Sequence, residues 1–369
     1  MPRTLSCFSI SIDWDTVSYG CMFCIQSKGS SQWVLRSPAM TFRIEAARDW
    51  GEYRDAWTEC MHEQYWFWKP KPLDFNREEE LEELETDFGK QDHLFLLARH
   101  EGHTNVLGIL GLKVVGETGV IRRWEPSVIA SQKETGLGRA LLGQGLTELS
   151  NRSVANVYTV IKYPKAAPGT LKWHSDLFDK SGFRTVEPMG AVMLQDLDAG
   201  QIRYTAPEGV AIQTGEEFAD RDLARLTVKA FTSTAEDRAI HGYDEIVTQP
   251  EPALKSITSL RAARLGRSPN DLWKVAIVSD EPAGVVGAFI LERQHQPKTG
   301  VLGPVGVLPE LRRQGIATAL VLAQLKSLKD YGCSYALVGT PAANIGAIAM
   351  YKGTGFADDY RQVTLGRDL

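Results

Sequence analysis

The hydrophobic and polar positions of the second half of the chain predict a mixed α/β unit. Two helices are expected near residues 216–231 and 252–265, after a first strand at "EGVAIQTG". Short apolar runs of strand length follow, the first two as a hairpin around "EPA": "LWKVAIVSD", "GVVGAFILERQ" and "TGVLGPVGV". Leucines at helical spacing then predict a helix over "LRRQGIATALVLAQLKSLKDYG". The unit ends with a strand, a helix and a strand: "CSYALVGT", "NIGAIAMYKGTG" and "YRQVTLGRD".

The first half of the chain repeats this order of elements. Residues 41–198 run from a strand through two helices, a hairpin, a further strand, a glycine-led helix ("QKETGLGRALLGQGLTELS"), a strand and a last helix that closes on Gly-Phe. A duplicated unit explains the repetition. The predicted fold class is therefore α/β, with two tandem units that each have a mixed central sheet flanked by helices. We expect the domains at 40–200 and 206–369.

Residues 1–39 do not continue the repeated pattern. Asp13 and Asp15 stand where a secretory signal needs its apolar centre, so this segment is not expected to direct export. We expect it to be an N-terminal extension outside the fold, and the sequence leaves open whether it is present in the native protein.

Composition narrows the classes of function. The net charge of −5 argues against a nucleic-acid or anionic-membrane partner, and no apolar run approaches the ~18 residues of a membrane span. Five scattered cysteines indicate a reducing compartment, so a cytoplasmic location is expected. One CxxC, Cys21 to Cys24, has no second pair to complete a zinc site, and we expect no bound metal. The oligomeric state stays open.

The start of the glycine-led helix in the second half, "VGVLPELRRQGIATAL", has the composition of an anion site. The first turn of a helix has unpaired backbone N–H groups and the positive end of the helix dipole. Gly315 lets an anion approach the backbone, Arg312 and Arg313 add positive charge, and the pattern matches neither usual nucleotide-binding fingerprint. Taken alone, two arginines at an exposed helix start are more often solvated charges than ligand-binding residues.

Two ordered motifs carry a family resemblance. The first is Val-x-Pro-x-x-Arg-x-x-Gly-x-Ala, from Val307 to Ala317, and the second is Asn-x-x-Ala-x-x-x-Tyr-x-x-x-Gly-Phe, from Asn344 to Phe356. Together they resemble the GNAT superfamily of acyl-CoA-dependent N-acetyltransferases. The resemblance covers 206–369 well and 41–198 more weakly.

The resemblance implies where acetyl-CoA, the co-substrate, is held. Backbone N–H groups of the arginine-to-glycine turn would hold the pyrophosphate, and the preceding strand would pair with the pantetheine amides. Pro304 fits such an open strand edge, because proline cannot complete a sheet ladder. The implied binding residues are Val305, Val307, Arg312, Arg313, Gln314, Gly315, Ile316, Ala317, Thr318 and Asn344. Asn344 has a simpler reading as the N-cap of its helix.

The same resemblance implies that Tyr351 is the catalytic acid. A phenol with an ordinary pKa near 10 is protonated at neutral pH and can protonate a departing thiolate. The amine must lose a proton before attack, and the strand motif "VLGPVGV" carries no carboxylate for this. Three carboxylates remain open as the base: Asp244, Glu245 and Glu292. The backbone N–H of Val307 is expected to polarise the acyl carbonyl.

The first repeat lacks the catalytic residue. Phe178 stands where Tyr351 stands, Leu171 replaces Asn344, and Lys133 replaces Arg312. Because phenylalanine has no proton to donate, the first repeat is expected to be catalytically degenerate, while its binding of CoA stays open.

We therefore expect an acetyl-CoA-dependent N-acetyltransferase. The acceptor is expected to be a primary amine of a small molecule or peptide that attacks directly in a ternary complex. The alternatives are a non-catalytic acyl-CoA-binding or regulatory protein, and a tandem acyltransferase that uses another acyl donor. The acceptor and the preferred acyl chain stay open.

Overall fold

The structure, a computed structural model, describes residues 33–36, 41–65, 77–122, 124–262, 266–292 and 297–369. These residues fall into two compact units. The N-terminal unit extends to Pro188 and also contains Gln362–Leu369, and the C-terminal unit contains Met189–Arg361.

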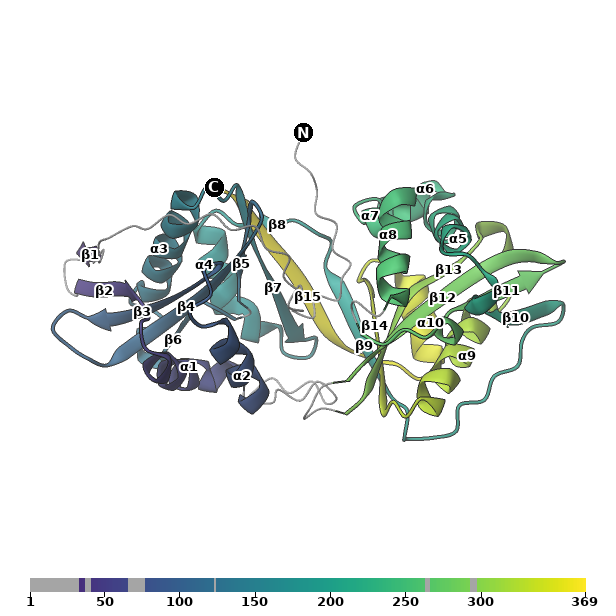
Figure 1. Ribbon diagram of the computed structural model, residues 1–369, viewed down its shortest axis with the longest axis horizontal. Helices are drawn as coiled ribbons and strands as arrows, with labels where there is room; N and C mark the ends of the chain where they lie inside the picture. The colour runs from purple at the N-terminus through teal and green to yellow at the C-terminus, as the bar shows by residue number, and fades with distance from the viewer. Residues whose placement is uncertain (1–32, 37–40, 66–76, 123, 263–265, 293–296) are drawn as a thin grey trace. The chain divides into compact units, whose positions relative to one another are not determined.

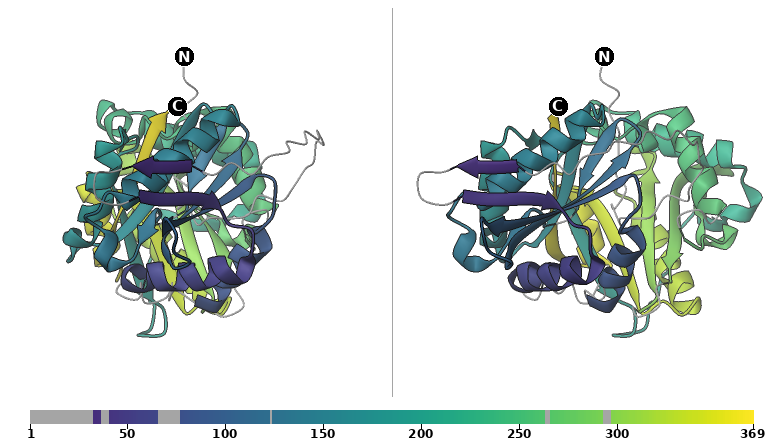
Figure 2. Two further views of the ribbon diagram at one scale, coloured as in Figure 1. Left: turned by 90° about the vertical axis from the view of Figure 1, so that its left-hand side faces the viewer. Right: turned by 60° about the vertical axis from the view of Figure 1, so that its left-hand side comes forward.

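The N-terminal unit is a mixed sheet with helices packed on it (Figure 2). Its helices are α1 (Trp50–Tyr65), α2 (Arg77–Asp87), α3 (Leu137–Asn151) and α4 (Lys172–Lys180). Its strands are β1 (Trp33–Arg36), β2 (Thr41–Ala46), β3 (His93–His100), β4 (Val106–Val115), β5 (Thr118–Ile121), β6 (Ser127–Val128), β7 (Asn156–Pro164) and β8 (Arg184–Thr185). The end of β15 (Ala357–Asp368) pairs antiparallel with β8 in this unit.

The C-terminal unit has the same kind of architecture, with more helices on one side of its sheet (Figure 1). Its helices are α5 (Asp220–Thr232), α6 (Ala235–His241), α7 (Glu245–Thr248), α8 (Pro250–Arg261), α9 (Ile316–Asp330) and α10 (Ile345–Gly353). Its strands are β9 (Gly190–Asp196), β10 (Val210–Thr214), β11 (Lys274–Val278), β12 (Glu281–Leu291), β13 (Thr299–Val307) and β14 (Tyr335–Pro341), followed by the start of β15.

The strand order of the C-terminal unit is β10-β11-β12-β13-β14-β9, and only β13 and β14 are parallel. Their pairing runs from Thr299 with Tyr335 to Leu302 with Val338 and then stops. At that point Gly303 and Pro304 add an irregularity to β13, where its register against β12 shifts. The two strands therefore diverge in the middle of the sheet, as expected for a proline that cannot join the ladder.

Side chains that alternate along the strands build a core on each face of this sheet. Val275 and Val285 pack with α5 and α8 on one face, and Ala276 and Val286 pack with α9 on the other. The alternation follows from the two-residue repeat of a strand. Both helices that carry the anion-site and tyrosine motifs, α9 and α10, contribute to the second core.

The predicted fold class is confirmed, with differences at the boundaries. β9 was expected to end the first repeat, but it pairs antiparallel with β14 along its whole length and so belongs to the C-terminal unit. The compact units consequently divide at Pro188 rather than between residues 200 and 206. The folded region also begins before Met40, because β1 pairs with β2; the rest of the segment 1–39 lies outside the described residues.

Strand registers show that the two units are built alike. In the C-terminal unit Gly284 is opposite Val307 and Thr299 is beside Tyr335. The corresponding pairs of the N-terminal unit are Gly108 with Val128 and Thr118 with Asn156. The duplication read from the sequence is therefore a duplication of strand pairing, which allows residues of the two units to be matched one by one.

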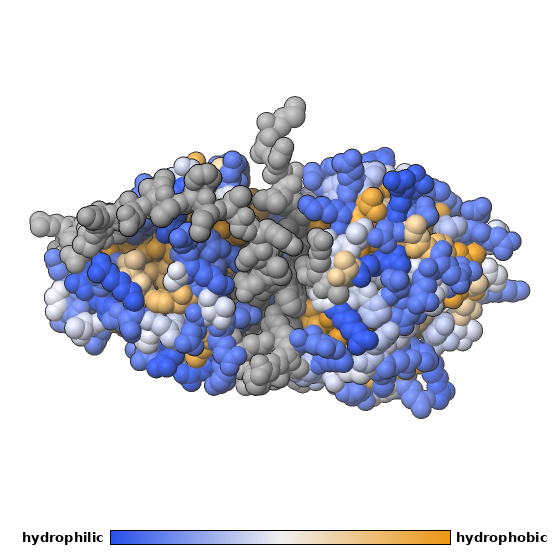
Figure 3. All heavy atoms as spheres, in the orientation of Figure 1, coloured by the Kyte–Doolittle hydropathy of each residue, from blue (hydrophilic) through white to orange (hydrophobic). Residues whose placement is uncertain are grey.

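The outer surface is polar where Figure 3 displays it. Hydrophilic residues predominate on the viewed face of both units, with hydrophobic residues in small groups between them. Within the described part of the chain, none of the helices has the length and apolar composition needed to cross a membrane.

Replacement of Leu320 by alanine should lower the free energy of unfolding by about 2–5 kcal/mol, because it leaves a cavity under α9. Leu320 is completely buried in the core beneath the diverging strands. Chemical denaturation of the purified variant measures the loss. Met189→Ala, at a side chain that is 44% exposed, is the control and should change stability by less than about 0.5 kcal/mol.

Candidate functional site

The divergence of β13 and β14 opens a cavity inside the C-terminal unit. Its volume is about 200 Å³, and its walls come from both strands and from α5, α7, α8 and α10. The strand residues at its floor are Gly303, Pro304 and Val305 on one side and Val338–Pro341 on the other. The cavity therefore lies where the sheet has lost its ladder of hydrogen bonds.

The unpaired edge of β13 faces this opening. The N–H of Leu308 donates to the carbonyl of Ala283 on β12, at 2.9 Å. Because successive residues of a strand point their amides to opposite sides, the amides of Val305 and Val307 face away from β12. The two valines predicted from the motif thus offer backbone groups on the cavity side of the strand, as an extended ligand would require.

The first turn of α9 is built around two residues with left-handed backbones. Gly315, the N-cap, has φ 80°, and Arg313 has φ 63°. No side chain caps the helix, so the backbone N–H groups of Ile316, Ala317 and Thr318 have no acceptor within the helix. Arg313, Gln314 and Gly315 are exposed. This geometry leaves a turn of outward N–H donors at the positive end of the helix dipole.

Arg312 has a different place from the one expected. Its guanidinium forms two ion-paired contacts with Asp237, at 2.9 and 3.1 Å, and donates to the carbonyls of Val307 at 3.0 Å and Ala230 at 2.8 Å. These four contacts occupy the side chain. Arg312 therefore ties the α9 turn to α5 and α6, and the exposed cation of the motif is Arg313.

Tyr351 lies on α10 with its ring against Phe356, at 5.6 Å between centroids, and it lines the cavity. The residue is only 4% exposed, and this burial raises the pKa of its phenol. The phenol is consequently protonated at neutral pH. Among the described residues, none makes a hydrogen bond to its hydroxyl, which leaves the proton available to a ligand in the cavity.

Asn344 is the N-cap of α10 and also lines the cavity. Its Oδ1 accepts a hydrogen bond from the N–H of Ala347 at 3.1 Å, and its Nδ2 lies 3.4 Å from Nε2 of His241. Because the amide nitrogen is a donor, Nε2 of this histidine is the acceptor. Burial lowers the pKa of His241 to about 4, so the imidazole is neutral at neutral pH. The capping interpretation is thus correct, and the amide still faces the cavity.

Only one of the three carboxylates considered as a base lines the cavity. Asp244 is 2% exposed and lies on the cavity wall, where its Oδ1 caps α7 through the N–H of Ile246, at 3.1 Å. Glu292 instead forms an ion pair with Lys298 at 2.7 Å and is not among the lining residues. Glu245 does not line the cavity either.

The sequence reading missed the segment that supplies His241. It assigned no helix between residues 231 and 252, where the structure has α6 and α7. The signal was present as a capping box, because Thr234 and Asp237 each bond the backbone N–H of the other. The same segment provides Asp237 for Arg312 and Asp244 for the cavity, so α6 and α7 contribute much of the chemistry of the site.

Part of the chain that contains this arrangement is similar to a known family. Residues 229–356 match the model of the Acetyltransferase (GNAT) family. The match covers less than half of the chain, and all of it lies in the C-terminal unit. The matched segment includes the diverging strands, α9 and α10, so the cavity and the uncapped turn both lie in the GNAT domain.

Similar proteins include two named mycothiol acetyltransferase. The protein from Cellulomonas flavigena is 26% identical over 246 residues, which are 64% of this chain and 64% of that protein. The protein from Frankia casuarinae is 26% identical over 271 residues, or 69% of this chain and 71% of that protein. The match thus spans less than two thirds of the Cellulomonas protein.

Solved structures share the fold over most of the chain. A GCN5-related N-acetyltransferase from Sphaerobacter thermophilus has a TM-score of 0.58 at 19% identity and covers 89% of this chain and 95% of that chain. A tandem GNAT protein from the clavulanic acid biosynthesis pathway has a TM-score of 0.54 at 16% identity, over 89% and 98%. At these identities the likeness concerns the fold.

The N-terminal unit repeats this layout with larger side chains at the matching place. Phe178 packs on Phe183 with centroids 4.9 Å apart at 67°, the same arrangement as Tyr351 on Phe356 at 68°. Phe178 therefore corresponds to Tyr351 in space as it does in sequence. Counting back along α4 and α10, Trp173 corresponds to Gly346 and His174 to Ala347.

Large side chains fill the matching place. His174 is 2% exposed, its Nε2 lies 2.9 Å from the carbonyl of Trp124, and its ring packs on both Trp124 and Trp173. Trp173 reaches the first turn of α3, where its Nε1 donates to the carbonyl of Lys133 at 2.9 Å. A Cβ at Gly138 would come within 2.8 Å of this indole. The turn that is open in α9 is thus covered in α3.

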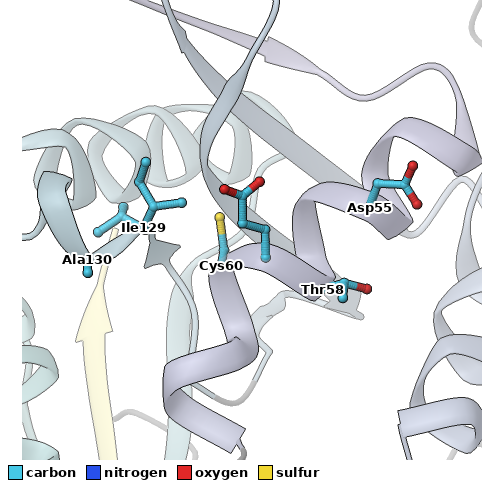
Figure 4. A pocket seen from close by; sticks show the side chains of 7 residues that line it. Asp55, Thr58, Cys60, Ile129 and Ala130 are labelled. Carbon is cyan, nitrogen blue, oxygen red and sulfur yellow. The ribbon is translucent and has the colours of Figure 1, made fainter.

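A second cavity, of about 500 Å³, lies in the N-terminal unit between α1 and the segment after β6 (Figure 4). Asp55, Thr58 and Cys60 line it from α1, and Ile129 and Ala130 line the other side. Burial raises the pKa of the Cys60 thiol, so it is protonated and a poor nucleophile. Although larger, this cavity has no phenol or imidazole comparable to those of the GNAT cavity.

Within the described ranges, no group of three or more His, Cys, Asp or Glu side chains is arranged so that it could hold a metal ion. Cys60 and Cys333 are buried free thiols. The CxxC of Cys21 and Cys24 lies outside the described residues.

Replacement of Asp237 by asparagine should destabilise the α9 turn by about 1–2 kcal/mol at pH 7, because it removes the charge that pairs with Arg312. Contact with Arg312 holds the pKa of Asp237 below its usual range. A lowered folded-state pKa means that this stability is present above the unfolded pKa near 3.9 and is lost as pH falls through the folded value. Urea unfolding of wild type and Asp237→Asn at pH 7 and pH 3 measures both. A difference that does not shrink at pH 3 would contradict the assignment.

Proposed function

We propose that this protein is an acetyl-CoA-dependent N-acetyltransferase whose chemistry takes place in the C-terminal unit. The observation that carries the proposal is the cavity between the diverging strands, which joins the free hydroxyl of Tyr351 to the unpaired edge of β13. The GNAT family match covers these same elements. Relatives named mycothiol acetyltransferase support acetyl as the transferred group.

Acetyl-CoA fits the groups present along this path. The N–H donors of the α9 turn, from Arg313 to Thr318, suit the pyrophosphate, and the exposed side chain of Arg313 adds positive charge. The amide of Val305 suits the extended pantetheine arm, and Asn344 also lines the cavity. In this proposal Arg312 positions the turn through Asp237 and does not touch the phosphates.

The proposed reaction is direct attack in a ternary complex. The amine nitrogen forms a bond to the thioester carbonyl carbon, and the bond from that carbon to sulfur breaks. Tyr351 donates its phenolic proton to the departing sulfur, and the Val307 amide polarises the carbonyl oxygen. Asp244 is the carboxylate proposed to receive the proton that the amine loses, because it lines the cavity. Neither buried thiol lies on the cavity wall, which is consistent with the absence of an acyl-cysteine step.

The acceptor is proposed to be a primary amine of a small molecule or peptide. Turnover of acetyl-CoA against amino acids, polyamines, amino sugars and peptide N-termini tests the activity. Tight binding of acetyl-CoA without transfer to any of these amines would instead favour a regulatory acyl-CoA-binding protein. Transfer only from a longer acyl-CoA would identify another acyl donor.

Replacement of Tyr351 by phenylalanine should lower kcat by about 100-fold or more, because the sulfur would leave without its proton. Binding of acetyl-CoA, measured by calorimetry, should stay nearly unchanged. Tyr335→Phe is the matched control. Tyr335 lies on β14 but does not line the cavity, so this variant should retain full kcat. Unchanged turnover in Tyr351→Phe would exclude this residue as the acid.

Only the C-terminal unit is expected to bind CoA. Calorimetry should give one site per chain, because Trp173 and His174 fill the corresponding place of the N-terminal unit. Gly346→Trp copies Trp173 into the C-terminal unit and should weaken CoA binding by at least about 10-fold. A Cβ at Gly346 meets nothing closer than 4.0 Å, so a side chain can start from this position. The melting temperature of the variant, measured in parallel, separates a loss of binding from a loss of stability. Two sites per wild-type chain, or undiminished binding in Gly346→Trp, would contradict this prediction.

A further inference from the structure

His241 connects the cavity to the short helix that the sequence reading missed. It is the last residue of α6, and it lines the cavity together with Asn344 from the start of α10. The proposed function gives Asn344 a part in holding the donor and leaves His241 without one. A partly buried imidazole beside a binding residue points to a role in binding.

The side-chain amide of Asn344 is held in one orientation. Its Oδ1 accepts the N–H of Ala347 at 3.1 Å, so the oxygen is turned toward the start of α10 and Nδ2 is turned away from it. Nδ2 has two protons, and Nε2 of His241, at 3.4 Å, accepts one of them. An N-cap uses only the oxygen of asparagine, so this second contact is not needed for capping. It leaves the other proton of Nδ2 for a ligand in the cavity.

The ring of His241 is placed by its own packing. It stands edge-on to Phe231, with 4.8 Å between the ring centroids and an interplanar angle of 86°. Phe231 lies against Gly306 of β13, where an added Cβ would come 2.9 Å from the aromatic ring. Gly306 belongs to the strand segment that borders the cavity. The packing therefore runs from this strand through two rings to Asn344.

α6 has a second attachment, one helical turn before His241. Asp237 pairs there with Arg312, at 2.9 and 3.1 Å. Because residues four apart on a helix are neighbours, one side of α6 reaches both the turn before α9 and the start of α10. The places proposed for the pyrophosphate and for the pantetheine arm are thus supported by the same helix.

To accept a hydrogen bond, the imidazole of His241 must be neutral. Burial lowers its pKa to about 4; the charge of Asp237 acts against this shift, and the charge of Arg312 acts with it. Both nitrogens of an imidazolium are donors, so a protonated ring would present an N–H to the N–H of Asn344. In the neutral ring with Nε2 as the acceptor, the proton is on Nδ1. This tautomer is a direct consequence of the contact.

We propose that His241 is a positioning residue for donor binding: its Nε2 accepts one proton of the Asn344 amide and so directs the other toward a carbonyl of the pantetheine arm. His241 touches neither reacting atom in this assignment, so it should contribute to the affinity for acetyl-CoA and little to kcat. The inference rests on the proposed binding of acetyl-CoA in the C-terminal unit and adds to it a residue outside both sequence motifs.

The tautomer of His241 tests the contact without any turnover. Nitrogen NMR of protein labelled at the histidine rings should give a neutral imidazole at pH 7 with its proton on Nδ1. The spectrum of His241→Gln identifies these signals by their loss. A proton on Nε2, or an imidazolium, would overturn the inference.

Two substitutions of His241 differ in where they place an acceptor. Glutamine places its Oε1 near the position of Nε2, whereas asparagine places its Oδ1 near Nδ1, so only His241→Gln keeps the contact. The Kd and KM for acetyl-CoA should rise about 2- to 10-fold in His241→Asn, the loss of one hydrogen bond, and less than about 2-fold in His241→Gln. The kcat of both should stay within about 2-fold of wild type. Equal effects of the two variants, or a fall in kcat instead, would contradict the positioning role.

A double-mutant cycle shows whether His241 acts through Asn344. Asn344→Ser keeps an oxygen that can cap α10 and removes the amide. In that background His241→Asn should raise the Kd for acetyl-CoA by less than about 1.5-fold, because the contact is already lost. Full additivity of the two changes would argue against the inference. His103→Asn, at an exposed histidine of the N-terminal unit, is the matched control and should leave the Kd unchanged. Melting temperatures of all variants separate a loss of binding from a loss of fold.

The proposed function and this inference fail in different ways. If the wild-type protein does not bind acetyl-CoA, the proposed function is wrong. If it binds acetyl-CoA and the His241 variants bind it equally well, the function stands and the positioning role is wrong.

Discussion

The site depends on one interrupted hydrogen-bond ladder. β13 and β14 pair only as far as Leu302 and Val338, and beyond that point a glycine and a proline break the register of β13. A sheet that separates in its middle leaves backbone amides and a cavity where a continuous sheet would have neither. The packing around it, with α9 on one face and α5 and α8 on the other, keeps the two strands apart.

The same backbone plan has been filled differently in the two units. The strand registers agree, and the aromatic pair that ends the α4 or α10 motif has the same geometry in each unit. In the C-terminal unit the residues next to the opening are small, Gly346 and Ala347, and the space remains open. In the N-terminal unit Trp173 and His174 occupy it, and each makes a hydrogen bond to a backbone carbonyl. Side-chain volume, with no change of fold, thus distinguishes a site from a packed core.

Within the C-terminal unit, charge is distributed according to burial. Arg312 is the motif residue with the clearest charge, yet its guanidinium is used up by Asp237 and two carbonyls. It sets the position of the α9 turn, whose exposed N–H groups and Arg313 remain for an anion. A buried carboxylate, Asp244, lines the cavity, whose other described lining residues are mostly apolar.

The sequence by itself determined the duplicated α/β layout, the glycine-led turn before α9 and the tyrosine of α10, because each has a local signature in periodicity, cap or spacing. It also contained the capping box of α6, although only the structure made its use visible. The partner of Arg312, the placement of Asp244 instead of Glu292 at the cavity, and the transfer of β9 to the C-terminal unit depend on contacts between residues far apart in the chain. Such contacts leave no periodic trace in the sequence. The unsatisfied hydroxyl of Thr227 likewise results from packing. Another threonine of the same helix, Thr232, donates its hydroxyl to the helix backbone.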